Sequence, residues 1–377
     1  MRMFGGMRPP RRAPWTMIVA SGAGERRTAI AAAEEISRTR TENIAVLLQE
    51  SPTSDDHAFP VGPVPFNSPI SAIAACLLWR PKAILFVEFA NNYHLAWWAR
   101  VFGIRIGIIN VNLSENRTRR LKRKPVGRWQ FHVIPRYAVQ ARIHARRLAA
   151  LGVQPGAICV TGIGMGRFRG DLPEGDAIRE DWRERLGLDE RTPVIVAGST
   201  YPEEEVALVR VFRQVRERYP EAKLVLAPRH LDRRESIAQA LAPDEYQRRS
   251  RAQFDENRPI WLLDTLGELK DVYSVATVAF VGGSWIPGIG GHSPLEALAW
   301  GVPTAVGPYT GQQEAVVEMG REAGAVTVTK TEAQLLDHWM RAIGDAEFRL
   351  DAALRARHLV QAAEGAYTRA FDAIVGR

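Results

Sequence analysis

The sequence contains very little cysteine and no long hydrophobic run. Only Cys76 and Cys159 occur among 377 residues, without metal-ligand spacing, so the sequence indicates neither a disulfide framework nor a zinc site. The longest apolar stretches, 70–79 and 83–90, are much shorter than the roughly 18 residues that cross a bilayer, so we expect no transmembrane helix. Residues 1–15 lack the apolar core of a signal peptide. We therefore expect a protein that stays in the cytoplasm.

Low-complexity sequence is also absent. No tract rich in Ser, Gly or Gln indicates a disordered region, and 46% hydrophobic with 24% charged residues is globular composition. A chain of 377 residues is too long for one ordinary core and matches two α/β domains of similar size. We expect two folded domains.

The net charge is +8, which favours a polyanionic partner: nucleic acid, an anionic membrane or a phosphorylated substrate. No nucleic-acid-binding module is visible, so we expect no nucleic acid partner. The densest basic run precedes Trp129 and Phe131, an arrangement that could lie on a lipid headgroup layer, although a solvated loop is an equal alternative. This basic run consists of Arg117, Arg119, Arg120, Lys122, Arg123, Lys124 and Arg128.

Short apolar runs alternate with helical patterns through the first half. Such alternation predicts a parallel sheet with helices on both faces. The predicted strands are 15–20, 44–49, 83–87, 104–110, 137–139 (or 133–134) and 158–161, with helices at 26–38 and 141–151. A loosely patterned, Gly-rich segment, 162–173, is the predicted linker.

The same alternation begins again after the linker. Its predicted strands are 193–197, 223–227, 260–263, 278–281 and 303–306, and its predicted helices are 203–219 and 293–300. Two successive Rossmann-like units with a cleft between them are the expected result, and the tail 351–376 is predicted as one continuous helix.

Polar motifs follow four strands of the second half, where ligands of open parallel sheets bind. Gly198-Ser199-Thr200 offers hydroxyls and free N–H groups to an anion, or simply a helix N-cap. Pro228-Arg229-His230 supplies a guanidinium that can grip a phosphate or carboxylate, with histidine beside it.

The other two motifs are rich in glycine. In Asp264-Thr265-Leu266-Gly267-Glu268-Leu269, Gly267 would let the backbone approach a flat base. The last motif, 281–296, carries two glycine pairs in a loop suited to cradling phosphate, and then Glu296, which could accept hydrogen bonds from a ribose. A buried capping role is the alternative for Glu296.

Taken in order, these four motifs resemble those of the bacterial Kdo transferases, which move 3-deoxy-manno-octulosonic acid from its CMP ester to a lipid acceptor. The match runs from Gly-Ser-Thr through Pro-Arg-His and Asp-Thr-x-Gly-Glu-Leu to Gly-Gly-His-x-Pro-Leu-Glu, closing with Gly307-Pro308. The resemblance implies a metal-independent, inverting transferase of the GT-B type, with two Rossmann-like domains facing each other across a cleft. It implies domains at 1–165 for the acceptor and 175–350 for the CMP-sugar, with helix 351–377 returning to the first domain.

Residue roles follow from the same resemblance. Gly267 to Leu269 would meet the cytosine, Glu296 the ribose, and Ser199, Arg229 and His230 the phosphate or sugar carboxylate. The full implied donor set is Ser199, Thr200, Arg229, His230, Gly267, Glu268, Leu269, Gly283, Ser284, Gly290, Gly291, His292 and Glu296.

The first half resembles the family's Gly-Glu loop at Gly24-Glu25, between a strand and a helix. Glu25 is implied as the base that deprotonates the acceptor hydroxyl, with Glu88 orienting it or the acceptor. An ordinary first-turn glutamate, favoured by the helix dipole, is the alternative for Glu25. The implied acceptor set is Gly24, Asn92, Asn112 and Ser114.

Departures from the family pattern gather on the acceptor side, where Asn110 to Ser114 and Asn116 replace an arginine-containing motif. On the donor side Tyr201 replaces a histidine and Ser293 an asparagine. Three alternatives stay open: a UDP- or GDP-sugar donor on the same fold, a non-enzymatic polyanion-binding protein, and an inactive scaffold. The preferred partners are a CMP-activated sugar, a lipid or glycan acceptor and the anionic inner face of the cytoplasmic membrane, with no cofactor and no metal.

Overall fold

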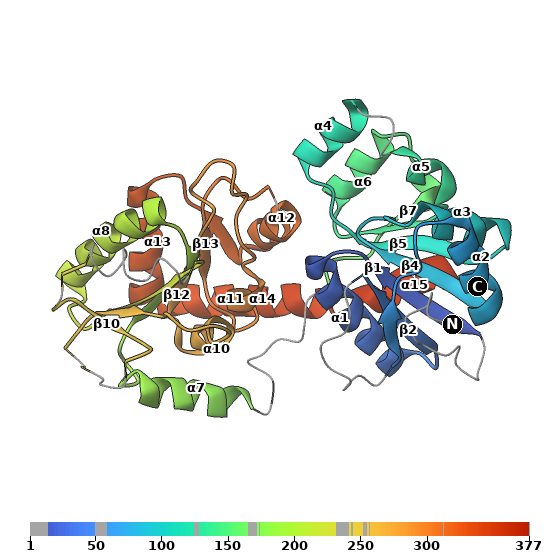
Figure 1. The fold of residues 1–377 in the computed structure, drawn as a ribbon. Helices are drawn as coiled ribbons and strands as arrows, with labels where there is room; N and C mark the ends of the chain where they lie inside the picture. The colour runs from blue at the N-terminus through green and yellow to red at the C-terminus, as the bar shows by residue number, and fades with distance from the viewer. Residues whose placement is uncertain are drawn as a thin grey trace. The chain divides into compact units, whose positions relative to one another are not determined.

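The chain divides into two compact units (Figure 1). Unit 1 comprises residues 1–164 and 363–377, and unit 2 comprises residues 165–362. The computed structural model describes residues 14–49, 59–123, 128–164, 172, 174–230, 241–242, 244–251, 255, 257–311 and 313–376. Each unit is an α/β fold built on its own parallel sheet, as the sequence predicts.

Unit 1 is built on a seven-stranded sheet in the order β3-β2-β1-β4-β5-β6-β7. The strands are β1 Trp15–Ala20, β2 Asn43–Leu48, β3 Val61–Pro63, β4 Pro81–Val87, β5 Arg105–Val111, β6 Tyr137–Val139 and β7 Ile158–Val160. The helices are α1 Ala23–Thr39, α2 Pro69–Trp79, α3 Tyr93–Val101, α4 Glu115–Arg123, α5 Gln130–Val133, α6 Arg142–Ala149 and α15 Ala366–Val375.

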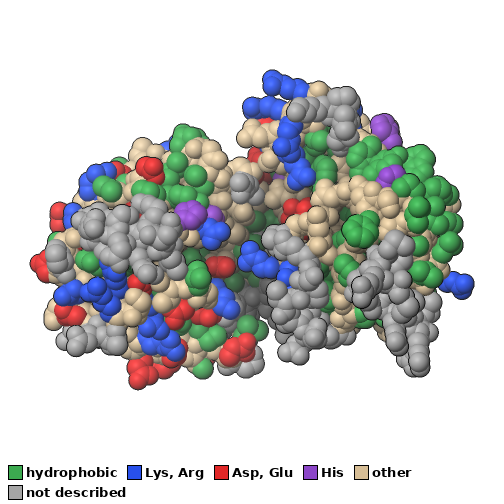
Figure 2. Space-filling model, viewed as in Figure 1, with side chains coloured by type: hydrophobic (Ala, Val, Ile, Leu, Met, Phe, Trp, Pro, Cys, Tyr) green, Lys and Arg blue, Asp and Glu red, His purple; other side chains and the backbone are tan. Residues whose placement is uncertain are grey.

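Both faces of this sheet are buried, which explains the continuous apolar strands. Alternate residues of β1 enter different cores: Met17 and Val19 pack with α2 and α3, whereas Ile18 packs with α1 and α15. On the outer side of α2 and α3, hydrophobic side chains reach the surface (Figure 2).

Unit 2 repeats the plan with the order β10-β11-β9-β8-β12-β13-β14. Its strands are β8 Val194–Thr200, β9 Lys223–Pro228, β10 Tyr246–Arg248, β11 Ile260–Leu262, β12 Val278–Val281, β13 Thr304–Val306 and β14 Val326–Val328. Its helices are α7 Gly175–Arg185, α8 Pro202–Arg218, α10 Leu269–Val272, α11 Leu295–Leu298, α12 Glu314–Ala323, α13 Glu332–Gly344 and α14 Ala346–Ala363.

Strand order reverses beside the first strand of each unit. In unit 1 the chain builds outward from β1 to β3 and then returns to place β4 on the other side of β1. In unit 2 β12 returns to the free side of β8. At such a switch point the loops after the two central strands diverge and leave room for a ligand.

One prediction about local structure is wrong, and one alternative that the sequence left open is excluded in part. The tail is not one helix, because α14 ends at Ala363 and α15 begins at Ala366 after Gly365, which adopts φ +76°. The basic run is not a loop over its first part, because 115–123 form α4. Part of the predicted linker, 165–171, and Lys124 lie outside the described residues.

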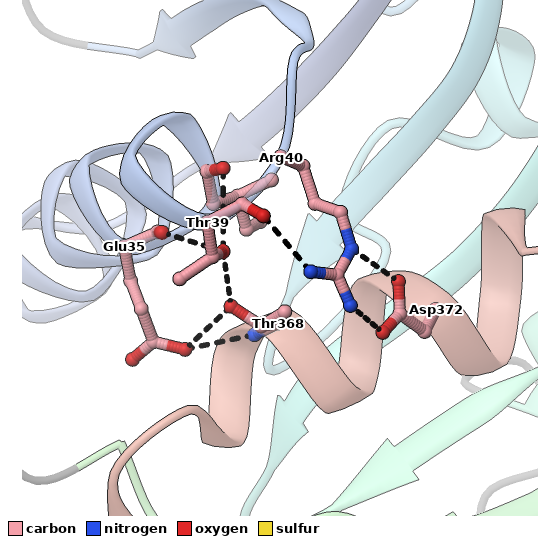
Figure 3. Close-up of polar contacts among 6 residues, drawn as sticks. Glu35, Thr39, Arg40, Thr368 and Asp372 are labelled. Carbon is pink, nitrogen blue, oxygen red and sulfur yellow. Dashed lines mark hydrogen bonds and ion pairs between the residues drawn. The ribbon is translucent and has the colours of Figure 1, made fainter.

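A polar cluster joins α15 to α1 within unit 1 (Figure 3). Glu35 accepts hydrogen bonds from the backbone N–H of Thr368, at 2.8 Å, and from its hydroxyl, which also lies 2.7 Å from the hydroxyl of Thr39. Arg40 forms a bidentate ion pair with Asp372. Because that pair is about half exposed, we assign most of the docking energy to the apolar face of α15.

That apolar face lies so close to β5 that only glycine fits at position 107. A Cβ atom there would stand 2.6 Å from Cδ1 of Ile374. We therefore expect Gly107→Ala to lower the free energy of unfolding by about 1–3 kcal/mol, the usual cost of overpacking. Urea titration measures this. The control is Gly156→Ala, whose Cβ would meet open space, and equal stability of the two variants would contradict the packing argument.

Candidate functional site

Three of the four motifs of unit 2 meet beyond the carboxyl ends of its central strands. Tyr201 follows β8, His230 follows β9, and His292 comes from the Gly-rich loop after β12. The ring of Tyr201 lies parallel to that of His292, with centroids 5.7 Å apart, and edge-on to that of His230 at 5.6 Å. The parallel strands thus bring together residues that are up to 91 positions apart.

Arg229 and His230 both lie near His292 in this cluster. Burial, reinforced by the charges of Arg229 and His230, lowers the pKa of His292 to about 4. Its imidazole is therefore neutral at pH 7. The side chains of Arg229 and His230 are exposed, and the backbone N–H of Arg229 donates to the carbonyl of Thr200 at 3.0 Å. Such an arrangement can hold an oxyanion with one cation and imidazole N–H donors.

A buried glutamate organises the Gly-rich loop. The carboxylate of Glu204, at the start of α8, accepts hydrogen bonds from the successive N–H groups of Gly283 (2.7 Å), Ser284 (3.0 Å) and Trp285 (2.8 Å). It also accepts one from the N–H of Tyr201 at 3.2 Å. Burial raises the pKa of Glu204 above its ordinary value, and these donors act in the opposite direction.

The predicted phosphate cradle needs a correction at Gly283 and Ser284. The N–H groups of Gly283 and Ser284 already donate to Glu204, so in this conformation they do not face a ligand. The hydroxyl of Ser284 is buried and bonds the carbonyl of Val281 and the N–H of Gly307. Gly290 and Gly291 adopt φ of +91° and +74°, which lets the loop fold back so that Gly291 donates to the carbonyl of Gly283.

Ser199 and Thr200 of the Gly-Ser-Thr motif differ in their exposure to solvent. Ser199 is only partly buried and adopts φ +56°, at a register shift of β8 against β9. The hydroxyl of Thr200 is buried and donates to Glu205 at 3.0 Å. Ser199 therefore keeps a side chain near solvent, whereas Thr200 serves the inside of the fold.

The loop before α10 presents an open surface. Gly267 adopts φ +83° with no atom near the position of a Cβ, and the neighbouring Leu266 is 85% exposed. Glu268 does not face outward freely, because it bonds Thr265 and pairs with Arg249 at 3.1 Å. Leu269 packs against the unit 2 core. An exposed leucine beside a bare glycine suits the face of an aromatic base.

Glu296 lies in the short helix α11, and its side chain is exposed. Burial of Tyr273 is the main cause of its raised pKa, and the charge of Glu296 is the second cause. The buried capping role for Glu296 is therefore wrong.

In unit 1, Glu25 and Glu88 face a common region at the carboxyl ends of β1 and β4. Oε2 of Glu25 accepts a hydrogen bond from the N–H of Ser21 at 2.8 Å, which matches the first-turn alternative. Its second oxygen has no partner among the described residues. Glu88 adopts φ +57° directly after β4, and burial together with the charge of Glu25 raises the pKa of Glu88.

Arg117 is the residue that the sequence reasoning misplaced. We grouped it with the basic run, yet its guanidinium lies 3.8 Å from the centroid of the Phe89 ring, and its charge opposes the raised pKa of Glu88. The N–H of Arg117 donates a hydrogen bond to the hydroxyl of Ser114 at 3.3 Å, at the start of α4. Nothing in the local pattern showed that it turns inward.

The implied acceptor residues have mixed surroundings. Asn92 is buried and caps α3, accepting from the N–H of Leu95 (3.0 Å) and donating to the carbonyl of Pro65 (2.8 Å). Ser114 caps α4 in a similar way, and Asn112 lies half-buried between β5 and Ser114. Gly24 belongs to the first turn of α1. Their roles toward an acceptor stay predictions.

Comparison with known proteins finds relatives among the Kdo transferases. Residues 2–163, nearly the whole first stretch of unit 1, match the family model described as 3-deoxy-D-manno-octulosonic-acid transferase (kdotransferase). The 3-deoxy-D-manno-octulosonic acid transferase of Chlamydophila psittaci is 32% identical over 268 residues, which cover 68% of this chain and 60% of the relative. The chain is therefore similar in sequence to the Kdo transferases, and its first part matches that family's model.

Solved structures agree on the fold. A UDP-GlcNAc 2-epimerase from Neisseria meningitidis aligns with a TM-score of 0.66 over 97% of this chain and all of the other, at 12% identity. WaaG, a glycosyltransferase involved in lipopolysaccharide biosynthesis, aligns with a TM-score of 0.60 over 97% of this chain and all of the other, also at 12% identity. The two-domain GT-B fold expected of a Kdo transferase is therefore confirmed as two parallel-sheet α/β units.

Two features complete the description of this Kdo transferase homologue. Within the described ranges, no three His, Cys, Asp or Glu side chains gather closely enough to hold a metal ion. None of the described helices is both long enough and apolar enough to cross a membrane.

The Glu204 arrangement makes a prediction about stability. Glu204→Gln replaces one carboxylate oxygen by an NH₂ group that faces backbone N–H donors, so we expect a loss of about 1.5–3 kcal/mol in the free energy of unfolding. Urea titration measures it. Glu203→Gln, one residue earlier and exposed, is the matched control and should change stability by no more than about 0.5 kcal/mol. A Glu204→Gln protein as stable as this control would refute the role.

Proposed function

We propose that the protein transfers Kdo, or a related 2-keto sugar acid, from its CMP ester to a lipid A-type or other glycan acceptor, with inversion. The observation that carries the proposal is the cluster of Arg229, His230 and His292 at the switch point of unit 2. It suits an anionic nucleotide-sugar, and it stands in a chain that is similar in sequence to the Kdo transferases. Because the chain spans only 60% of the first relative's length, the activity is a proposal for this chain.

In this proposal unit 2 holds the donor. The open surface at Leu266 and Gly267 receives the cytosine, the exposed Glu296 accepts hydrogen bonds from the ribose, and Arg229 with His230 and His292 binds the phosphate and the sugar carboxylate. Arginine is suited to both anions because its planar fork matches two oxygens.

Unit 1 supplies the base. Glu25 removes the proton of the acceptor hydroxyl, whose oxygen attacks the anomeric carbon of the sugar while the bond to the phosphate oxygen of CMP breaks. CMP leaves with the bonding electron pair, and Arg229 balances its charge. Arg117 stabilises the pair of carboxylates, and Glu88, with its raised pKa, orients Glu25 or the acceptor. No divalent ion is needed in this scheme.

The base role is tested by Glu25→Gln. A general base contributes typically 10²–10⁴-fold, so transfer should fall by at least about 100-fold while CMP affinity is unchanged. The assay incubates the protein with CMP-Kdo and a lipid extract and reads the product masses, with excess EDTA in a parallel sample that should retain transfer. Calorimetry with CMP, and with UDP as comparison, measures nucleotide binding.

The control is Glu34→Gln on the same helix, away from its first turn. Transfer that survives in Glu25→Gln would remove Glu25 from the mechanism. Tighter binding of UDP than of CMP would replace the proposed donor class.

We further propose that the acceptor side docks on an anionic membrane through the outer face of α2 and α3. Figure 2 shows hydrophobic side chains gathered there, to the right of the view. The exposed ones are Phe66 (68%), Ile70 (74%), Leu77 (56%), Leu78 (54%), Trp97 (44%), Val101 (58%) and Phe102 (43%). An exposed apolar patch of this kind marks an interaction site. Tryptophan and phenylalanine side chains also suit the depth of the lipid headgroups.

Charge favours lipid over a second protein as the occupant. Between positions 59 and 114 the chain carries a single acidic residue, Glu88, which is partly buried next to Arg117. The exposed Arg80 follows α2 directly, and the exposed Arg100 lies in the last turn of α3. By contrast, the basic run contributes less than the sequence suggested, because Arg117 turns inward and Arg119 pairs with Glu115. Arg8, Arg11 and Arg12, which would also favour an anionic surface, lie outside the described residues.

Vesicle pelleting tests this surface. The wild-type protein should pellet with vesicles containing anionic lipid, and Ile70→Ser/Leu77→Ser should weaken binding at least about tenfold, since each buried side chain is worth about 1.5–3 kcal/mol. The matched control is Val206→Ser/Leu350→Ser, two comparably exposed residues of unit 2. If the wild-type protein ignores anionic vesicles at every salt concentration, the lipid part of the proposal fails and a soluble glycan becomes the acceptor.

A further inference from the structure

Tyr201 occupies a position where this chain departs from the family pattern, which has a histidine there. It follows β8 directly, and its N–H is held by Glu204 at the start of α8. Its ring lies near two histidines of the proposed donor site, parallel to His292 at an interplanar angle of 13° and edge-on to His230 at 83°. The backbone bond and the two ring contacts therefore fix where the side chain lies.

The hydroxyl of Tyr201 lies 3.3 Å from Nε2 of His292. The other ring nitrogen, Nδ1, has no hydrogen-bond partner within the described part of the chain, and Arg229 and His230 are nearby. The backbone of His292 is fixed as well, because its N–H donates to the carbonyl of Gly282 at 3.1 Å. The imidazole is thus held at one nitrogen and open at the other.

The direction of this hydrogen bond follows from acidity. A phenol O–H is a stronger donor than a neutral imidazole N–H, and an imidazole nitrogen is a stronger acceptor than a phenol oxygen. The tyrosine hydroxyl therefore donates, and Nε2 accepts. In a neutral imidazole the proton must then sit on Nδ1, since the hydrogen bond made by one ring nitrogen sets the state of the other.

We infer that Tyr201 is a positioning residue that fixes His292 as the Nδ1–H tautomer and thereby presents a neutral N–H donor to the oxyanion of the bound donor nucleotide. This inference rests on the proposed function, because it takes the phosphate or sugar carboxylate of that donor as the anion. Burial and the charge of Arg229 keep His292 uncharged at neutral pH, so without Tyr201 the ring could equally turn a bare nitrogen toward the anion. A bare nitrogen would repel the oxyanion.

The experiment combines ¹⁵N NMR of the histidine rings with CMP binding on the full chain. In the wild-type protein the spectrum should show His292 protonated at Nδ1, with the signal assigned by its loss in His292→Gln. In Tyr201→Phe, which keeps the ring stack, the Nε2–H form should appear, and the dissociation constant for CMP should rise about 3- to 10-fold, the range for one hydrogen bond.

The matched control is Tyr219→Phe at the opposite end of α8, which should change neither the tautomer nor the CMP affinity. A wild-type His292 protonated at Nε2, or a Tyr201→Phe protein with unchanged tautomer and CMP affinity, would overturn the inference and leave the proposed function standing. If His292 is the Nδ1–H tautomer but the wild-type protein does not bind CMP, the proposed function fails, and the oxyanion role of Tyr201 fails with it.

Discussion

Parallel strands end on the same side of their sheet, and the candidate site of each unit depends on that constraint. Every strand pair in both sheets is parallel, so the loops after β8, β9 and β12 emerge together, as do those after β1, β4 and β5. The cost of this topology is that each sheet must be covered on both faces. The helices do so, and they leave the carboxyl ends of the strands for Arg229 and His292 in one unit and for Glu25 and Glu88 in the other.

A single buried carboxylate shapes the glycine-rich loop after β12. Glu204 accepts hydrogen bonds from the N–H groups of three consecutive residues, 283–285. Its carboxylate therefore occupies the donors that a glycine-rich turn could otherwise offer to an anion of the substrate. The part of the loop that remains for binding is its C-terminal end. There Gly290 and Gly291 turn the chain back and place His292 beside Tyr201. The glycines therefore allow the loop to fold, and they contribute to binding only by positioning the side chain of His292.

In unit 1, different surfaces also have different roles. Arg117 leaves the basic run and supports a pair of carboxylates, whereas α2 and α3 expose apolar side chains with almost no acidic neighbours. α15 closes the opposite face of the sheet, and the glycines at 107 and 164 admit Ile374 and Tyr367 at distances that no Cβ would allow. Tyr367 has a pKa raised to about 12 by burial and by the nearby charges of Glu35 and Glu88, so the returning helix reaches the region of the carboxylate pair.

The sequence by itself determined the strands and the motifs that follow them. β1 and β12 lie where their apolar runs predicted, because a fully buried strand has a continuous local signature. Four motifs in a fixed order also indicated the family, and the family implied the GT-B fold. These are properties of short segments read one after another.

Only the tertiary structure decided how those motifs are used. Glu204 meets Gly283 across 79 positions and Tyr201 meets His292 across 91, and no local pattern encodes such pairings. The burial of Thr200, the inward turn of Arg117 and the exposure of Glu296 likewise depend on which elements pack nearby. The physical reason is that hydrogen bonding and desolvation act between neighbours in space, whereas periodicity and motif order record only neighbours along the chain.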